Sequence, residues 1–270
     1  MPVSLYYQVK YSFFGLGGLN TKKNDSVPVI VSLTSIPSRF KKLHLGIKSI
    51  LDQSVLPEKI VLWLNESQRG KIPKSLEKLK GSIFEIRYSQ LDCSHLKLVE
   101  SLKHFPNKII VTADDDLIYR KKWLECLYLE HQRHPECIIA NQSRIISYDR
   151  HGQLKPYREW PTNYNHHVNS MLLLPIGSAG ALYPPNSLSS TTLDWELFLK
   201  LAPKADDLWF KAMSLLQHTK SIQSSLFPGH PIPIWGSQEI NLKKWNIQED
   251  KNRTQWLALT KHFKFDLKID

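Results

Sequence analysis

The sequence predicts an α/β fold built on a mostly parallel central sheet. Short apolar segments, which are typical of buried strands, alternate with segments whose apolar residues recur every three or four positions, which is typical of helices. Repeated strand–helix units of this kind form parallel sheets with right-handed crossovers. Such sheets bind ligands at the carboxyl ends of their strands, so we expect the functional residues at that edge.

The expected elements follow one another in chain order. We expect strands over residues 28–34, 59–64, 83–88, 108–111 and 137–140, and helices over residues 40–53, 94–105, 121–134 and 205–217. In the first of these helices, Leu43, Ile47 and Ile50 fall on one face. Residues 148–190 are irregular, and long irregular segments in compact domains are commonly functional. Aromatic residues such as Tyr157 suggest that this segment is a packed loop facing the substrate.

The pattern divides the chain into three parts. Residues 28–220 carry the alternating strands and helices and are expected to form the catalytic domain, and residues 221–270 are expected to pack back on it as a C-terminal extension. Residues 1–27 form an N-terminal arm, which we expect to be a peripheral strand or a loose segment. An alternative is that the arm touches a membrane surface through its aromatic side chains Tyr11, Phe13 and Phe14.

The composition limits the class of protein. Hydrophobic residues make up 41% of the 270 residues, enough for a sizeable core, and the formal net charge is +11. A strong positive charge favours anionic partners, which are nucleotides, nucleic acid or an acidic membrane surface. The lysines are scattered and no arginine-rich tract occurs, so we do not expect nucleic acid as a partner.

Cysteine usage and hydropathy indicate where the protein works. The three cysteines form no Cys-x-x-Cys pair, which argues against a zinc ribbon and fits a reducing cytosol. No segment has about 18 uninterrupted apolar residues, so no transmembrane helix is expected. We therefore expect a cytoplasmic protein, with the basic charge allowing peripheral contact with the inner face of the plasma membrane.

The most informative motif is the run Asp114-Asp115-Asp116, which closely follows the apolar segment 108–111. Three adjacent carboxylates repel one another where a buried strand emerges, and a cation among them would offset this repulsion. Hard oxygen ligands suit Mg²⁺ or Mn²⁺, and such ions also bind substrate phosphates. The run therefore predicts a metal-assisted enzyme acting on a phosphorylated or nucleotide-linked substrate. The alternative is a solvated acidic turn.

Two further segments carry residues suited to a ligand site. Residues 177–180, Gly-Ser-Ala-Gly, would let a backbone approach a ligand closely, or they form a plain turn. Asp206 and Asp207 open the last expected helix, where one carboxylate can cap the helix while the other faces a cleft. Neither a Gly-x-Gly-x-x-Gly turn nor a Gly-x-x-x-x-Gly-Lys loop is present, which argues against dinucleotide dehydrogenases and P-loop kinases.

Taken in order, these segments resemble a GT-A-fold glycosyltransferase of the family 2 type, and more closely the small bacterial transferases found among surface-polysaccharide genes. The matching segments are residues 31–39 as first strand and nucleotide loop, 49–54 as the end of the next helix, 110–116 as the DXD segment, 177–183 as the donor-sugar loop and 205–207 as the acidic pair. The resemblance implies a GT-A-like αβα sandwich. Two departures are the Leu-Asn-Glu at residues 64–66, where such enzymes often place an acidic uracil contact, and the absence of the Gln-x-x-Arg-Trp motif of processive synthases.

The resemblance also implies roles for the candidate residues. The donor would be a nucleotide-sugar, with UDP as the expected nucleotide, and the acceptor a glycan or a lipid-linked sugar. Mn²⁺ or Mg²⁺ would bind Asp116 and Asp114, with His230 as a third ligand. Asp207 would be the general base of an inverting transfer, with Asp206 as the second candidate. The expected donor-binding residues are Thr34, Arg39, Asn65, Lys97, Asp114, Asp115 and Gly180. Arg39 and Lys97 would neutralise phosphate, unless they are ordinary surface charges.

Two other functions stay open at the level of sequence. A sugar nucleotidyltransferase also uses an Asp-bound metal on a similar sheet. It would need a glycine-rich, arginine-containing first loop, and residues 32–39 contain no glycine. A non-catalytic protein that binds nucleic acid or membrane is supported by the charge of +11 alone. The two acidic motifs argue against it, because they would repel phosphate unless a metal were bound.

Overall fold

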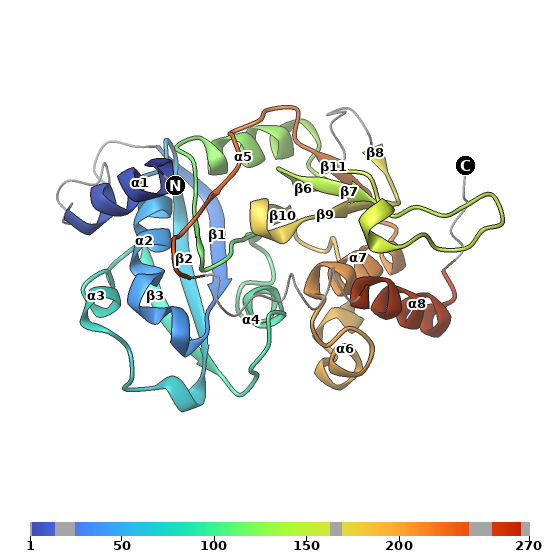
Figure 1. Ribbon diagram of the computed structural model, residues 1–270, viewed down its shortest axis with the longest axis horizontal. Helices are drawn as coiled ribbons and strands as arrows, with labels where there is room; N and C mark the ends of the chain where they lie inside the picture. Colours follow the sequence, from blue (N-terminus) through green and yellow to red (C-terminus); the bar gives the residue numbers. More distant parts are fainter. Residues whose placement is uncertain (1, 14–24, 163–168, 238–249, 266–270) are drawn as a thin grey trace.

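Eight strands form the central sheet of the computed structural model, which describes residues 2–13, 25–162, 169–237 and 250–265 (Figure 1). These strands are β1 (Ser26–Thr34), β2 (Leu56–Asn65), β3 (Phe84–Ser89), β4 (Ile109–Thr112), β6 (Ile138–Ala140), β8 (Asn169–Ser170), β10 (Ala181–Tyr183) and β11 (Ser221–Gln223). Their order across the sheet is β3-β2-β1-β4-β10-β6-β11-β8.

The strand directions confirm the predicted fold class. Strands β3, β2, β1 and β4 run parallel to one another, and β6 runs parallel to β11. Strand β10 lies between these two groups and is antiparallel to both of its neighbours, and β8 is antiparallel to β11. The sheet is therefore mostly parallel. The antiparallel insertion of β10 was not predicted, because three residues are too few to show a periodic pattern.

Helices cover both faces of the sheet. They are α1 (Pro2–Phe13), α2 (Phe40–Leu51), α3 (Lys74–Glu77), α4 (Leu96–His104), α5 (Trp123–Arg133), α6 (Trp195–Leu201), α7 (Asp206–Leu216) and α8 (Lys251–Phe263). In β1, Val29 and Val31 join the core under α1, α2, α3 and α5, whereas Ile30 joins the core under α4, α6, α7 and α8. Because successive residues of a strand face opposite sides, one strand supplies both cores, and the result is an αβα sandwich (Figure 1).

Two small sheets lie beside the central one and bring distant segments together. Strand β5 (Leu117–Ile118) pairs with β12 (Ile232–Pro233), and β7 (Ser143–Ile145) pairs with β9 (Leu173–Pro175). Since β5 directly follows the Asp run, its pairing with β12 places residues 230–233 next to that run.

The N-terminal arm differs from the expectation. Residues 2–13 form the helix α1 and not a strand or loose segment. Tyr11 is buried, and its hydroxyl donates a hydrogen bond to Asp52 Oδ2 at 3.1 Å. Tyr11 therefore cannot face a membrane, because packing on the core uses its ring. The side chain of Phe13 and the whole of Phe14 lie outside the described residues.

The C-terminal segment also begins differently from the prediction. Strand β11 starts at Ser221 and belongs to the central sheet, so the segment predicted as an extension begins inside the sheet. Further along, α8 packs against the same core as α6 and α7 through Trp256 and Leu259. Within the described ranges, no helix has both the length and the apolar character that crossing a membrane requires.

Candidate active site

A cavity of about 490 Å³ lies where β4 ends and α7 begins. Seven of the predicted site residues line it, namely Arg39, Lys97, Asp114, Asp116, Asp206, Asp207 and His230. These residues come from loops and helix starts far apart in the sequence. They converge at the carboxyl end of a parallel strand, which is where open α/β sheets bind their ligands.

Arg39 connects the loop after β1 to the Asp run. Its Nη1 lies 2.5 Å from Asp115 Oδ1, and its Nη2 lies 3.1 Å from Asp116 Oδ2. Ser35 Oγ donates a hydrogen bond to the second oxygen of Asp115 at 2.5 Å. Asp115 is therefore held within the protein, where burial raises its pKa, and it does not line the cavity. The middle carboxylate anchors the loop while Asp114 and Asp116 reach the cavity.

Tyr119 sets the position of the Asp114 backbone. The Asp114 N–H donates a hydrogen bond to Tyr119 Oη at 2.7 Å, and the same hydroxyl donates to the Ser178 carbonyl at 3.2 Å. Tyr119 is buried and thus ties the loop after β4 to the turn before β10. Sequence analysis missed Tyr119, because no local pattern reveals which backbone groups a buried hydroxyl will reach.

Lys97 connects the two acidic motifs. Its Nζ lies 2.8 Å from Asp114 Oδ1 and 3.0 Å from Asp206 Oδ2, and 7% of its side chain is exposed. Burial alone would lower the pKa of Lys97, but Asp114 and Asp206 hold it well above its usual range. Burial would likewise raise the pKa of Asp206, but Lys97 holds it below its ordinary value. Lys97 is thus a buried cation of the site and not an ordinary surface charge.

The prediction that one of the two Asp residues caps α7 is wrong. The N-cap position of α7 is Ala205, so neither Asp206 nor Asp207 occupies it. Asp206 is directed to Lys97, because a buried ammonium needs a compensating carboxylate more than the helix end needs a cap. Burial, followed by the negative charge of Asp206, raises the pKa of Asp207.

A close backbone approach holds Asp207 in place. The Gly177 N–H donates a hydrogen bond to Asp207 Oδ1 at 3.2 Å, and a Cβ at Gly177 would lie 2.7 Å from that oxygen. A side chain at residue 177 would therefore force the Asp207 carboxylate to move. The predicted close approach of this segment occurs, and here it is made to a carboxylate of the protein.

Gly180, predicted to bind the donor, does not line the cavity. Its φ is +100°, a region that favours glycine, and a Cβ there would overlap the Trp123 indole. Trp123 Nε1 donates a hydrogen bond to the Ala179 carbonyl at 2.7 Å. Gly180 is therefore required by the packing of α5 against the turn before β10.

Thr34 and Asn65 also lie outside the cavity lining. Thr34 Oγ1 donates a hydrogen bond to the Trp63 carbonyl at 2.9 Å. Asn65 Oδ1 accepts a hydrogen bond from the Ser67 N–H at 3.0 Å and so caps the short turn after β2. Thr34 is thus engaged by the neighbouring strand β2, and Asn65 by the turn that follows its own strand.

The Asp run retains negative charge toward the cavity. Burial, followed by the charge of Asp114, raises the pKa of Asp116 to about 6, even though Arg39 pairs with it. A divalent cation beside Asp114 and Asp116 would relieve this repulsion. Mg²⁺ commonly binds through one or two carboxylates together with waters and substrate phosphates, so these two residues fit such an ion.

His230 does not complete a three-ligand metal site. Across the described part of the chain, no three His, Cys, Asp or Glu side chains are grouped so that they could hold a metal ion. His230 lines the cavity, but its carbonyl accepts a hydrogen bond from Arg120 Nε at 3.2 Å and its ring packs edge-on against Phe227. The predicted ligand set is therefore reduced to Asp114 and Asp116.

The structure adds polar residues that sequence analysis did not assign to the site. They are Gln142, Arg144, Lys204 and Asn252, and they line the cavity together with Tyr157 and with Ser178 of the predicted donor-sugar loop. The Arg144 guanidinium lies 5.0 Å from the centre of the Tyr157 ring. Asn252 is buried, and its Oδ1 has no hydrogen-bond partner among the described residues. The irregular segment 148–190 was the one signal for this side of the cavity, and it pointed to Tyr157.

Comparison with known proteins gives few matches at the level of sequence. No protein-family model matches the chain. Curated proteins named lysine–tRNA ligase, from the Corby, Lens and Philadelphia 1 strains of Legionella pneumophila, are 29% identical over 131 residues. The match covers 47% of this chain and 24% of those proteins, so the chain spans about a quarter of the length of the curated relatives it matches.

Similar solved structures include residues 1–349 of Staphylococcus aureus TarS, with a TM-score of 0.47, 14% identity, and coverage of 92% of this chain and 75% of that one. The 4-diphosphocytidyl-2C-methyl-D-erythritol synthase of Anaerococcus prevotii has a TM-score of 0.44, 14% identity, and coverage of 77% and 90%. An apo UDP-glucose pyrophosphorylase has a TM-score of 0.42, 8% identity, and coverage of 89% of this chain and 98% of that one.

All three TM-scores lie below 0.5, so the fold class rests on the arrangement of strands in the central sheet. Its strand order shows the mostly parallel α/β sheet that the sequence predicts, with an acidic cavity at the carboxyl edge.

Proposed function

We propose that the chain is a glycosyltransferase that moves a sugar from a nucleotide-sugar donor to an acceptor hydroxyl with inversion. The observation that carries this proposal is the convergence of two acidic groups on one cavity, with Lys97 joining them. Asp114 and Asp116 follow β4, and Asp206 and Asp207 begin α7. The group after β4 is suited to binding a donor diphosphate with its cation. The group at the start of α7 is suited to taking a proton from an acceptor hydroxyl.

The donor side of the cavity would hold the diphosphate. Asp114 and Asp116 would hold Mg²⁺ or Mn²⁺, and the ion would stabilise the charge that builds on the leaving diphosphate. Arg39 and Lys97 line the same side and supply positive charge that does not depend on the ion. In this proposal Lys97 also keeps Asp206 ionised while the donor binds and leaves.

Asp207 is the proposed general base. Its carboxylate would accept the proton of the acceptor hydroxyl as that oxygen attacks the anomeric carbon and the bond from that carbon to the diphosphate oxygen breaks. A raised pKa suits this role, because a base works best when its pKa approaches the operating pH. The Gly177 N–H would hold one carboxylate oxygen and leave the other for the acceptor. By resemblance we propose a UDP-sugar donor and a glycan or lipid-linked acceptor in bacterial surface-polysaccharide synthesis.

A sugar nucleotidyltransferase is the second candidate, because acidic residues with Arg39 and Lys97 would also suit attack on a nucleotide phosphate. Its first loop would be expected to carry glycine, and residues 32–39 have none. Asp207 favours the glycosyltransferase, because a sugar 1-phosphate nucleophile is already ionised at neutral pH and requires no base.

One paired assay separates these two reactions. A panel of nucleoside diphosphate sugars is incubated with the protein in Mn²⁺ or in EDTA, and nucleotide release is measured. In parallel, pyrophosphate release is measured from nucleoside triphosphates with sugar 1-phosphates. Metal-dependent release of nucleoside diphosphate, lost in Asp207→Asn and kept in Asp194→Asn, supports the proposal. Asp194 is the matched control because it caps α6 away from the cavity. Release of pyrophosphate alone would assign the nucleotidyltransferase reaction.

A further inference from the structure

We propose that helix α1, with the basic groove beside it, docks the protein on an anionic phospholipid bilayer. The inner side of α1 is fixed to the protein. Tyr11 is buried against the core, and Ser4 Oγ donates a hydrogen bond to the Pro233 carbonyl at 2.8 Å. Lys10 Nζ also lies 2.6 Å from Asp52 Oδ2. These contacts determine which side of the helix faces outward.

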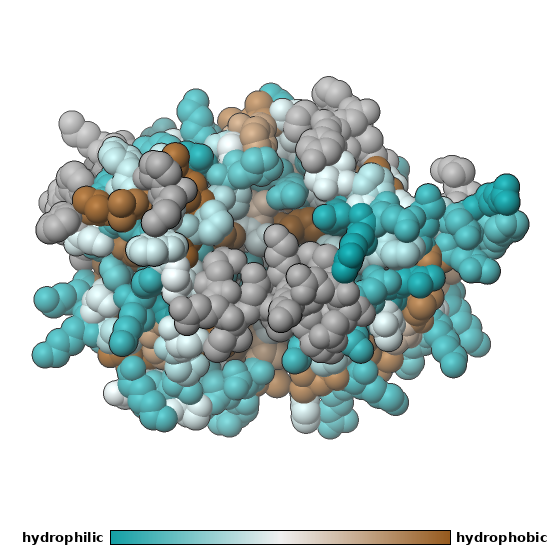
Figure 2. Space-filling view, viewed as in Figure 1, coloured by the Kyte–Doolittle hydropathy of each residue, from teal (hydrophilic) through white to brown (hydrophobic). Residues whose placement is uncertain are grey.

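The outer side of α1 is apolar. Ten large hydrophobic side chains of the described residues are exposed, and α1 holds four of them, Val3, Leu5, Tyr6 and Val9. They are 51%, 52%, 64% and 49% exposed. Figure 2 shows hydrophobic side chains over the position of α1. Scattered exposed hydrophobic residues are normal, but a cluster on one short helix indicates an interaction surface.

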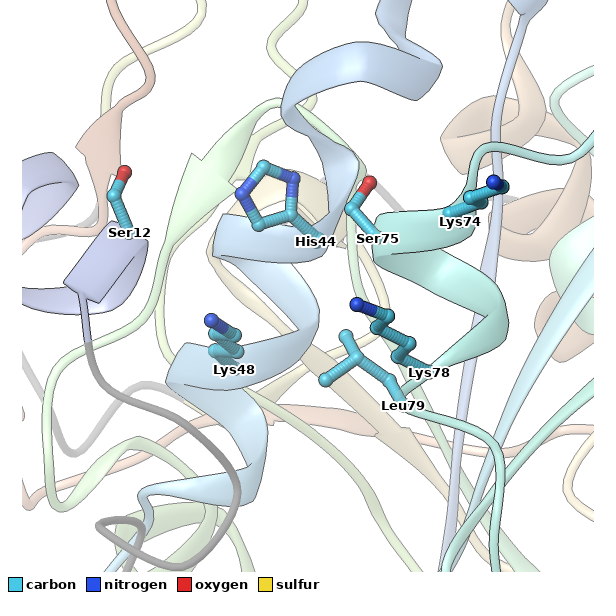
Figure 3. Close-up of a pocket in the computed structure, with 7 residues that line it drawn as sticks. All are labelled: Ser12, His44, Lys48, Lys74, Ser75, Lys78 and Leu79. Carbon is cyan, nitrogen blue, oxygen red and sulfur yellow. The ribbon is translucent and has the colours of Figure 1, made fainter.

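The groove beside α1 is basic. It has a volume of about 620 Å³ and lies between the end of α1, helix α2 and helix α3 (Figure 3). His44, Lys48, Lys74 and Lys78 line it, and no acidic side chain of the described residues does. Lys48 Nζ donates a hydrogen bond to the Tyr11 carbonyl at 2.6 Å, so this lysine holds the end of α1.

Lys74 and Lys78 are the groove lysines available to a ligand. Both are exposed, and neither forms an ion pair within the described residues. The neighbouring Lys80 differs, because its Nζ lies 3.1 Å from Glu77 Oε2. In Figure 3 the Lys78 side chain extends from the end of α3 toward Lys48, whereas the Lys74 side chain, at the start of α3, extends away from Ser12 of α1.

Trp235 is an exposed aromatic residue that closely follows β12, the strand that contacts α1. Its side chain is 62% exposed, and its carbonyl accepts a hydrogen bond from Lys42 Nζ of α2 at 2.5 Å. Two residues earlier, Pro233 contacts α1 through Ser4 and also lines the catalytic cavity. Tryptophan is favoured at membrane–water interfaces. A membrane bound by α1 and Trp235 would therefore lie beside the mouth of the cavity.

A bilayer fits this surface better than a soluble polyanion does. An apolar helix face with adjacent lysines is the arrangement by which interfacial helices bind anionic membranes. A nucleic acid would use the lysines and leave Val3, Leu5 and Val9 in water. Each lysine near an anionic membrane surface raises the partition coefficient of the protein onto the membrane by about fivefold. The apolar side chains and the lysines should therefore both contribute.

Vesicle flotation of the full chain tests the proposal. Vesicles of phosphatidylcholine, alone or mixed with phosphatidylglycerol, are used at low and high salt. Wild-type protein should float with the mixed vesicles at low salt and much less with phosphatidylcholine alone or at high salt. The pair Lys74→Gln and Lys78→Gln should weaken partition by about 25-fold, from about fivefold per lysine. The pair Leu5→Glu and Val9→Glu should abolish flotation.

Matched controls lie on another helix. Leu199 and Lys200 of α6 are also exposed, so Leu199→Glu with Lys200→Gln changes the same residue types away from α1 and should float like wild type. Thermal unfolding checks that all variants fold. The proposal would be overturned if the wild-type protein did not float with the mixed vesicles. It would also be overturned if the control variant on α6 lost as much flotation as the variants on α1 and in the groove. Lysine variants that float normally but lose binding to a short RNA duplex would assign the groove to nucleic acid instead.

Discussion

Lys97 and Asp206 form a buried ion pair, with 3.0 Å between Nζ and Oδ2. The same Nζ lies 2.8 Å from Asp114 Oδ1, so one ammonium group compensates a carboxylate from each acidic motif. Because one carboxylate comes from the loop after β4 and the other from the start of α7, the pairing also determines how far apart the two motifs lie. The chemistry proposed for the cavity depends on this spacing.

Replacing Lys97 with methionine should destabilise the protein by about 3–5 kcal/mol, because Asp206 would be left buried without its partner. The effect depends on pH. Asp206 has a lowered pKa in the folded state, so its stabilising contribution is present above the ordinary aspartate pKa of about 3.9 and is lost as the pH falls through the lowered value. Urea unfolding at several pH values checks this, and the difference between wild type and variant should shrink in acid.

The control for this variant is Lys80→Met. Lys80 pairs with Glu77 on the surface, with side chains 47% and 45% exposed, so its loss should cost less than about 1 kcal/mol at any pH. Equal destabilisation by both substitutions would mean that the pair at Lys97 has no special energetic role.

Replacing Asp207 with asparagine should lower turnover by about 10²- to 10⁴-fold, the usual contribution of a general base. Donor binding should change little, because the Gly177 N–H can still donate to the amide oxygen. Since burial raises the pKa of Asp207 and only the ionised carboxylate accepts a proton, wild-type kcat should rise with pH through a value above the ordinary aspartate pKa. Steady-state kinetics across pH, with calorimetric donor titration, measures both effects.

Loss of donor binding in the Asp207→Asn variant would make Asp207 a binding residue. Retention of the anomeric configuration in the product would exclude a single displacement.

Replacing Asp116 with asparagine should remove most metal-stimulated turnover while the protein stays folded. The pKa of Asp116 is raised to about 6, so protons compete with a cation at this carboxylate, and Mn²⁺ affinity should increase as the pH rises through about 6. Titration of Mn²⁺ by electron paramagnetic resonance at pH 5 and pH 7 (about one unit either side) tests this directly. Full activity of the variant in EDTA would contradict a metal role for Asp116.

Replacing Gly177 with alanine should reduce turnover more than stability. The new Cβ would lie 2.7 Å from Asp207 Oδ1 and would displace the carboxylate, and a misplacement of about 1 Å can cost about 10²-fold in rate. Gly81→Ala is the matched control, because a Cβ there meets no atom within 4 Å. Comparing kcat with the midpoint of thermal unfolding for both variants separates a catalytic effect from a packing effect.

Much of the fold and part of the site follow from local sequence. Apolar segments alternating with amphipathic helices specify the strands and helices, because a strand and a helix repeat their buried side chains at different periods. The run at residues 114–116 and the pair at 206–207 stand out because adjacent carboxylates are costly beside a buried element. A parallel sheet places the run at 114–116 at the carboxyl edge, as the sequence predicts, whereas its meeting with the pair at 206–207 depends on how α7 packs.

Tertiary structure decided which partner each side chain has. Whether Asp206 caps its helix or pairs with Lys97 depends on where α4 passes α7, and no local pattern carries that distance. The same reason explains why Asp115 anchors the loop, why Asn65 caps a turn and why Asn252 reaches the cavity. The period of a sequence determines which face of an element is buried, whereas hydrogen bonds and ion pairs require distances set by how the elements pack.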